Sequence, residues 1–347
     1  MSTATPRSSL RISLQSIAIG SVVWHPKPMT PTHDKILVRL LQEEDLEVAD
    51  RIMRLAFGSF LGLPEPEKFM GDAGFVRSRW RTDPSAAFVA EVDSSVAGSN
   101  FATTWGSVGF FGPLTIRPDL WDRGVGKRLM EPIVELFQKR NIRHAGLFTF
   151  AQSQKHVGLY QRFGFWPRFL TAILSKPVQR QPAGVIQWSR FSDVEAAAQK
   201  ANLDACRALT SEILEGLDPT QEVRAVFDQN LGETVLLWDD SRLAAFAVCH
   251  FGAGTEAGSG TCYIKFGAAR PDPRVEQTFD RLLTACEAMA ADQDLSRIVG
   301  GVNTARHEAY RKMLACGFRT DLQGVAMQRP NEPGYNRPGV YLIDDWR

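Results

Sequence analysis

Four short patterns recur in the same order in the two halves of this chain, at offsets of 147 to 153 residues. The matched pairs are Arg117-Pro118-Asp119 with Arg270-Pro271-Asp272, Gly164-Phe165 with Gly317-Phe318, the turn at Asp93 with that at Asp240, and the helix start at 40–45 with that at 190–193. One such match carries little weight, but four at nearly one offset indicate an internal repeat. Since 347 residues are also enough for two domains, we expect two copies of one fold.

The repeated unit combines a run of antiparallel strands with a later alternation of strands and helices. In the first half we predict strands over 36–41, 87–92, 96–105, 108–116, 144–150 and 165–174, and helices over 44–57, 66–80, 126–140 and 153–163. Alternating apolar residues around a Ser-rich turn indicate the hairpin, and apolar residues at helical spacing indicate the helix over 126–140. The order predicts an α/β fold with an α+β mixed sheet and helices on both faces.

Composition places the segment boundaries. Residues 1–34 are predicted to be a disordered tail, because the first 33 residues lack acidic side chains and are rich in Ser, Thr and Pro. An organelle-targeting peptide and a misassigned start are the alternatives. We expect the first domain over 35–178, a linker over 179–184 and the second domain over 185–347. The aromatic residues near the C-terminus predict an ordered tail that packs across the two halves near a cleft.

Overall composition narrows the class of function. Hydrophobic residues make up 44% and charged residues 23%, as in soluble globular proteins, and no segment predicts a membrane span. A formal net charge of +1 argues against a nucleic-acid partner. The five cysteines form no C-x-x-C pair, which favours buried, reduced thiols in a cytoplasmic protein over disulfides. The six histidines lack metal-ligand spacing, so we expect no metal. The oligomeric state stays open.

The stretch from Arg117 to Leu129 carries the strongest chemical signal. An apolar run ends in Arg-Pro-Asp, and a turn containing Gly124 and Gly126 leads directly into an amphipathic helix. Glycines at these places allow successive backbone N–H groups to point into one concavity at a helix N-terminus, which favours an anion such as a pyrophosphate. The alternative is a plain strand-to-helix turn.

Together with L-Y-Q-R-F-G-F over 159–165, this turn resembles the GNAT-type N-acetyltransferase family, in a tandem arrangement with a degenerate second domain. The family pattern Gln/Arg-x-x-Gly-x-Gly/Ala falls on 121–126, with Trp121 in place of the usual Gln or Arg. The resemblance implies that acetyl-CoA is the co-substrate and that the loop amides bind its pyrophosphate. The residues carried over for this role are Asp122, Arg123, Gly124, Val125, Gly126 and Lys127.

Further roles follow from the same resemblance. In this family the strand before the loop splays from the next one, so the main-chain groups of Leu114, Thr115 and Ile116 are expected to pair with the pantetheine arm. Pro113 has no N–H to donate and suits such a strand, with a bulge in an ordinary strand as the alternative. Tyr160 stands four residues before Gly164, where the family places the general acid for the leaving thiolate. Ser153 and His156 open the same helix and are weaker candidates for the adenosine diphosphate end. A core tyrosine is the alternative reading of Tyr160.

The sequence identifies neither the general base nor the acceptor as clearly. Glu91 and His144 are titratable groups on central strands, but each is more often structural, and ordered water could serve equally as the base. The second half lacks glycines between Gly267 and Gly300 and has Met313 in place of the tyrosine, so we expect it to be degenerate. The resemblance implies that the segment over 57–80 forms one wall of the acceptor pocket. Its aromatic residues, where they line that pocket instead of the core, favour a small-molecule amine with an apolar part as the acceptor. The alternative function is a non-catalytic acyl-CoA sensor or interaction module.

Overall fold

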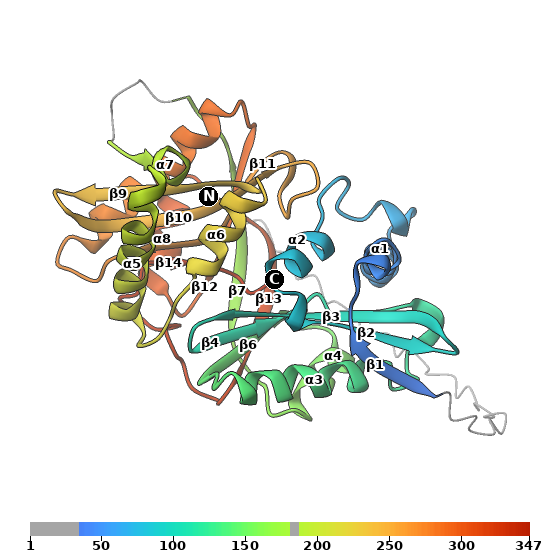
Figure 1. Cartoon of the computed structure of the whole chain (residues 1–347). Helices are drawn as coiled ribbons and strands as arrows, with labels where there is room; N and C mark the ends of the chain where they lie inside the picture. The colour runs from blue at the N-terminus through green and yellow to red at the C-terminus, as the bar shows by residue number, and fades with distance from the viewer. Residues whose placement is uncertain (1–34, 181–186) are drawn as a thin grey trace, which may run out of the picture. The chain divides into compact units, whose positions relative to one another are not determined.

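The computed structural model describes residues 35–180 and 187–347, so the predicted tail over 1–34 and most of the predicted linker lie outside the described residues. Both halves contribute to one sheet of fourteen strands, and the expected mixed α/β fold is confirmed (Figure 1). No helix in the described part of the chain is long and apolar enough to cross a membrane. Four of the five cysteines are buried and Cys316 is half-buried.

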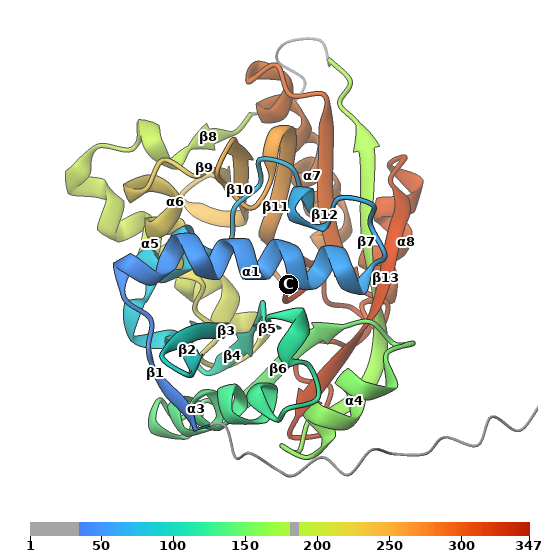
Figure 2. The ribbon, with the colours of Figure 1, turned by 90° about the vertical axis from the view of Figure 1, so that its right-hand side faces the viewer.

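The first half contains seven strands and four α-helices. They are β1 (Ile36–Leu40), α1 (Leu46–Phe60), α2 (Val76–Thr82), β2 (Ala87–Val92), β3 (Ser95–Trp105), β4 (Val108–Phe111), β5 (Thr115–Ile116), α3 (Val125–Lys139), β6 (His144–Thr149), α4 (Gln154–Gln161) and β7 (Trp166–Pro177). Helices α1 and α2 cover one face of the strands, and α3 and α4 cover the other (Figures 1 and 2). Helix α3 buries Leu129, Ile133 and Phe137, which share one helical face.

The second half repeats this order. It contains β8 (Ser189–Arg190), α5 (Ala196–Ile213), α6 (Thr220–Asp228), β9 (Gly232–Asp239), β10 (Arg242–Gly252), β11 (Gly258–Ala269), α7 (Val275–Asp292), β12 (Arg297–Asn303), α8 (His307–Ala315), β13 (Arg319–Arg329) and the additional β14 (Leu342–Ile343). Asp93 and Asp240 both turn with positive φ, at 50° and 53°, and Gly164 and Gly317 do so at 82° and 91°. The predicted repeat is therefore confirmed at its turns.

Two sequence predictions need correction. The helix expected over 66–80 is a short 3-10 turn, Pro66–Lys68, followed by α2, because Met70 and Gly71 adopt positive φ values that a helix does not allow. The single strand expected over 108–116 is divided into β4 and β5 at Gly112-Pro113, whose peptide bond is cis. Proline has no N–H group to continue the ladder at that point.

The two halves exchange their long last strands. The strand order is β1-β2-β3-β4-β6-β13-β7-β12-β11-β10-β9-β8, so β13 lies between β6 and β7, and β7 lies between β13 and β12. Val325 and Met327 of β13 are buried in the apolar cluster of α3 and α4. Ala172 and Leu174 of β7 are buried in the cluster of α7 and α8. Each half thus completes the core of the other.

Matched polar contacts hold the exchanged strands. Arg329 donates from Nη1 to the Phe163 carbonyl at 3.2 Å. Lys176 donates from Nζ to the Cys316 carbonyl, also at 3.2 Å. Donors and acceptors are each 153 residues apart, the offset of the repeat. In both halves the accepting carbonyl comes directly before the Gly-Phe pair, so the repeated glycine turn is also the contact point for the partner half's strand.

Candidate functional site

Strands β4 and β6 diverge at one point, which we call the fork and define by Phe110 and Gly146. They pair in parallel up to that point, with Phe110 opposite Gly146 as the last pair. Beyond it, β5 pairs with β3 on its other edge, through Thr115 and Ser99. Because β5 and β6 do not pair, an edge of β5 opens toward β6. An extended ligand could bind there as an added strand.

The direction of the backbone groups on β5 follows from one hydrogen bond. Arg117 donates its N–H to the Ala97 carbonyl of β3 at 2.8 Å. Since successive residues of a strand point to opposite edges, Thr115 also points toward β3, whereas Leu114 and Ile116 point to the open edge. The Ile116 carbonyl accepts a hydrogen bond from the Trp121 indole at 2.9 Å. The groups left at this edge are those of Leu114 and the N–H of Ile116.

The turn before α3 exposes a helix N-terminus. Asp122 and Gly124 have φ values of 65° and 85°, and Gly124 is the N-cap residue, with no side chain that could bond the first helical N–H groups. The first turn also contains no acidic residue. A Cβ on Gly126 would lie 3.2 Å from Cδ1 of Ile116, so glycine allows the helix to approach β5 closely. The uncapped N–H groups and the helix dipole favour an anion here.

Lys155 is a cation of this turn that the sequence reasoning missed. It forms an ion pair with Asp122 at 2.8 Å, and its Nζ lies 5.5 Å from the centre of the Trp121 ring. Arg123, Lys127 and Arg128 are exposed on the same turn and the start of α3, and Arg128 pairs with Glu131. Lys155 lies on α4, outside the glycine turn. No local sequence motif identifies it as a residue of this site, because it reaches the turn only through the packing of α4.

Tyr160 lies on α4, buried beside the end of β4. Its ring packs edge-on against Phe111, with centroids 5.6 Å apart. Burial raises the pKa of the Tyr160 phenol above its ordinary value, so the hydroxyl remains protonated at neutral pH. Burial is the whole cause of this pKa shift, and no hydrogen bond to the hydroxyl contributes to it. A protonated donor beside diverging strands can serve a ligand atom that arrives there.

Ser153 and His156 lie together at the start of α4. The Ser153 hydroxyl and His156 Nδ1 are 2.9 Å apart. The His156 ring packs on Phe60 at the end of α1, with centroids 5.1 Å apart. Burial, with a smaller contribution from Lys155, lowers the pKa of His156 below its ordinary value. A neutral imidazole here can accept or donate one hydrogen bond but adds no positive charge.

The two candidate bases have structural surroundings. Glu91 accepts hydrogen bonds from Arg39, the Nε bond being 2.9 Å long, and both lie on the β1–β2 pair. His144 is buried at the start of β6, and burial, with a smaller effect of Arg168, lowers its pKa to about 4. It is neutral at physiological pH. Within 35–180 and 187–347 no cluster of three or more His, Cys, Asp or Glu residues could hold a metal ion.

The segment over 57–80, expected to form an acceptor wall, also contacts the second half. Phe57 and Phe69 stack at 5.3 Å and pack on the core under α1, while Leu61 and Leu63 are exposed. Gly74 donates its N–H to the Thr255 carbonyl at 2.8 Å, in the loop between β10 and β11. The wall is therefore partly core and partly an interface between the halves.

In the second half, the equivalent helix start carries acidic side chains of its own. The Arg274 N–H donates to Oδ1 of Asp272 at 2.7 Å, and Glu276 stands in the first turn of α7. These carboxylates repel a second anion. Met313, at the position that corresponds to Tyr160, is fully buried.

The second half also fills its own strand opening. Strands β11 and β12 stop pairing after Ile264 and Gly300, and β14 then pairs with β11, placing Ile343 opposite Gly267 and Leu342 opposite Ala268. Gly267 and Ala268 correspond to Leu114 and Thr115 at the repeat offset of 153 residues. The C-terminal segment thus occupies the place that is open in the first half.

The C-terminal segment packs against the rest of the chain. Tyr335, Tyr341 and Trp346 are all buried. In Figure 1 the end of the chain lies beside α2, in agreement with a hydrogen bond from Arg79 to the Arg347 carbonyl. The tail therefore reaches from β11 in the second half to the first half.

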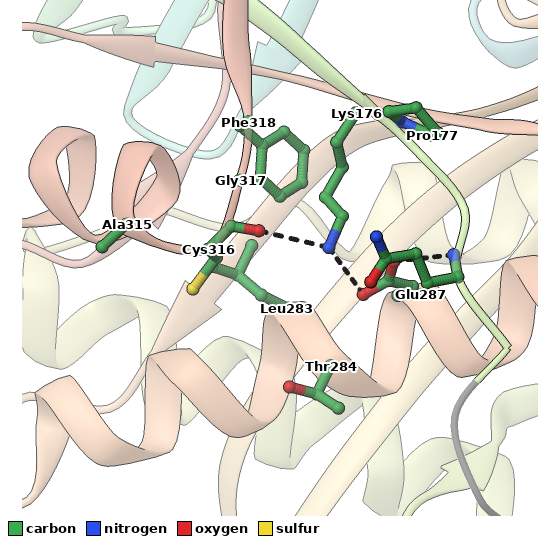
Figure 3. Close-up of a pocket in the computed structure, with 10 residues that line it drawn as sticks. Lys176, Pro177, Leu283, Thr284, Glu287, Ala315, Cys316, Gly317 and Phe318 are labelled. Carbon is green, nitrogen blue, oxygen red and sulfur yellow. Dashed lines mark hydrogen bonds and ion pairs between the residues drawn. The ribbon is translucent and has the colours of Figure 1, made fainter.

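A cavity of 430 Å³ lies elsewhere, beside the contact of the exchanged strand (Figure 3). Lys176 pairs there with Glu287 at 2.9 Å, and Glu287 also accepts the Gln179 N–H at 3.0 Å. The hollow is bounded by α7 and the turn at Gly317. It contains none of the residues predicted to bind the cofactor, and its charged groups already have partners.

Comparisons with known proteins agree with this geometry. Residues 50–165 match the sequence model of the Acetyltransferase (GNAT) family. A Pyrococcus horikoshii protein named as an acetyltransferase superposes with a TM-score of 0.64 at 12% identity, over 93% of this chain and 99% of that one. A GCN5-related N-acetyltransferase from Sphaerobacter thermophilus gives 0.55 at 14% identity, over 85% and 96% of the two chains. A tandem GNAT protein from the clavulanic acid biosynthesis pathway gives 0.51 at 14% identity, over 85% and 98%. No curated protein matches the sequence.

Proposed function

We propose that this chain, whose residues 50–165 match the acetyltransferase (GNAT) family and whose fold is similar to that of a tandem GNAT protein, is an acetyl-CoA-dependent N-acetyltransferase with one active site, in its first half. The observation that carries the proposal is the opening between β5 and β6 beside an uncapped helix N-terminus. The acceptor is the amine of a small molecule, and the acetyl group passes directly to it in a ternary complex.

The cofactor would bind along three groups of residues. Its pyrophosphate would accept hydrogen bonds from the amides of Gly124, Val125, Gly126 and Lys127, next to Asp122 and Arg123. Its pantetheine arm would pair with the open edge of β5 at Leu114 and Ile116, and Ser153 and His156 would lie toward the adenosine diphosphate end. Lys155 adds a positive charge near the same turn. Trp121 stands where the family usually has Gln or Arg, and its indole N–H donates to the Ile116 carbonyl.

The chemical step needs one donor from the protein. The amine nitrogen attacks the thioester carbonyl, a tetrahedral species forms, and the C–S bond then breaks to release a thiolate. Tyr160, protonated because burial raises its pKa, would donate to that sulfur. The proton lost by the amine would leave through ordered water, since Glu91 is bonded to Arg39 and the pKa of His144 is about 4.

A titration of acetyl-CoA into the purified protein, followed by calorimetry, tests binding and stoichiometry. One site per chain is expected, because β14 and Asp272 occupy the equivalent places of the second half. Two sites per chain would overturn the assignment of the second half, and absence of binding would overturn the proposed function.

The alternative, an acyl-CoA sensor, is motivated by Trp121 and by the missing base. A panel of small amines with apolar parts, assayed by thiol release, separates the two. Tyr160→Phe should lower the transfer rate by about 10²-fold or more and leave acetyl-CoA affinity unchanged. Binding without thiol release for any amine, in wild type and variant alike, would favour the sensor.

A further inference from the structure

Arg79 joins three parts of the molecule at the break between β4 and β5. Its side chain is buried on α2, and Nη1 donates to the Gly112 carbonyl at 2.6 Å. Nε and Nη2 donate to the two carboxylate oxygens of Glu256 in the second half, at 2.8 and 3.0 Å. Nη2 also donates to the Arg347 carbonyl of the tail. A guanidinium is suited to this task because its donors lie in one rigid plane.

Gly112 directly follows Phe111, the last residue of β4. Its N–H donates to the Phe101 carbonyl at 2.8 Å, and its own carbonyl accepts from Arg79. Its φ of 144° is one that other residues rarely adopt, and Pro113 follows without an N–H group. Both hydrogen-bonding groups of Gly112 are therefore fixed. Its carbonyl is held by Arg79, whose own position depends on Glu256 in the second half.

The tail reaches the other arm of the fork. The Trp346 ring lies against Gly146 of β6, where a Cβ would overlap it. The Arg347 guanidinium lies 4.7 Å from the centre of the Tyr263 ring and pairs with Asp345 at 3.0 Å. Because Arg79 binds both Gly112 and Arg347, it connects the end of β4 with the segment that covers the start of the divergence on β6.

The start of β4 is held by the second half as well. Ser107 donates its N–H to the Gly216 carbonyl at 2.7 Å, and Asp218 donates to the Trp105 carbonyl at 3.1 Å. Strand β4 is thus fixed at both ends by contacts outside the first half's own sheet. A strand held in this way cannot shift toward β6 unless those contacts break.

The charge on Arg79 is required where it lies. Glu256 is fully buried, and its other cationic partner is Lys265 at 2.8 Å. Lys265 is shared with Glu222 at 3.4 Å. Removal of Arg79 would leave two buried carboxylates around one ammonium group and leave the Gly112 carbonyl without its charged donor. Unpaired buried charges and an unbonded buried carbonyl raise the free energy of the folded state, and the backbone at Gly112 would move to reduce that cost.

We propose that Arg79, together with Glu256 and the tail residues Asp345–Arg347, forms a brace that fixes the opening between β5 and β6. Arg79 is a positioning residue: it acts through Gly112 on the edge that receives the pantetheine arm. The inference rests on the proposed function, because it assigns the second half a part in cofactor binding even though that half has no site of its own.

The test compares two ligands by calorimetry in the full chain. Coenzyme A carries the pantetheine arm, and 3′-phospho-ADP lacks it. In Arg79→Met the affinity for coenzyme A should fall about tenfold or more, whereas the affinity for 3′-phospho-ADP should change less than about twofold. Arg79→Lys, which keeps a donor and the charge, should recover part of the coenzyme A affinity. Glu256→Gln should show a smaller loss of the same kind.

Arg270→Met is the matched control. Arg270 is also buried, donates to the Leu243 carbonyl at 2.8 Å and pairs with Glu212, but it lies on the α5 side of the second half. It should lower the melting temperature and leave both affinities unchanged. Equal loss for both ligands in Arg79→Met, or no loss in a folded variant, would overturn the brace. If Arg79→Met does not fold, unchanged binding in both Arg79→Lys and Glu256→Gln would overturn it. Failure of the wild type to bind coenzyme A would instead overturn the proposed function.

Discussion

The exchange of β7 and β13 predicts that the two halves unfold together, and Leu174→Ala tests this. Leu174 belongs to the first half by sequence, yet it is fully buried in the apolar cluster of α7 and α8. If the exchange is correct, a cavity made at Leu174 weakens the second half directly. It weakens the first half only through the shared strands β7 and β13.

The expected magnitude follows from burial. Leu174 has 0% exposure and lies in the same apolar cluster as Phe318 and Met313, so truncation to alanine leaves a cavity that the surroundings cannot fill. Leucine-to-alanine changes at such sites lower the free energy of unfolding by about 3 kcal/mol. Leu129→Ala is the matched control, because Leu129 is equally buried but packs only within the first half, under β1 and β2. It should have a similar effect of about 3 kcal/mol.

The assay is urea unfolding combined with hydrogen exchange of peptides from β2 in the first half and β10 in the second. Both variants should shift one common transition, and exchange should rise in both peptides for each variant. Two separate transitions, each moved by only one variant, would refute cooperative unfolding. Faster exchange in β2 alone after Leu174→Ala would refute the exchange of strands, because Leu174 would then support its own half.

Three smaller predictions concern the first half. Burial lowers the pKa of His144 from 6.5 to about 4, so the stability that its neutral form contributes is present above pH 6.5 and is lost as the pH falls to 4. His144→Gln should therefore flatten the dependence of the free energy of unfolding on pH between these values and leave transfer activity unchanged. Gly124→Ala should lower the free energy of unfolding by about 1 kcal/mol in urea titrations, because φ is 85° although a Cβ would meet no neighbour. Lys155→Met should weaken coenzyme A binding about twofold to fivefold at low salt and less at high salt, as a titration at two ionic strengths would show.

The repeat and the glycine turn could be predicted from sequence because local chemistry specifies them. Positive φ values at Asp93 and Gly164 need particular residue types, and the second half repeats them. The start of α3 at Gly124 has the same origin. Tyr160 was placed by its spacing to Gly164, and it does lie beside the end of β4. Short-range patterns of this kind can be recognised in a single sequence.

The strand exchange could not be predicted, because β7 and β13 carry similar apolar patterns and either could pair with either half. Which pairing forms depends on contacts such as that of Lys176 with Cys316, 140 residues apart. The same holds for Arg79, which the sequence does not distinguish from its neighbours Arg77 and Arg81. Its burial depends on Glu256, 177 residues away. Strand β14 has only two residues, too few for a periodic signal.

The lost site of the second half and the brace of the first half have one structural cause. Strand β14 fills the opening beside β11, and residues Asp344 to Arg347 follow this strand directly. Because β14 is held at Gly267 and Ala268, this short segment is aimed at the first half, where Trp346 meets Gly146 and Arg347 meets Arg79. A cofactor in the second opening would displace β14 and release that segment from the fork. By filling the second opening, β14 therefore also holds the brace residues in place at the first opening.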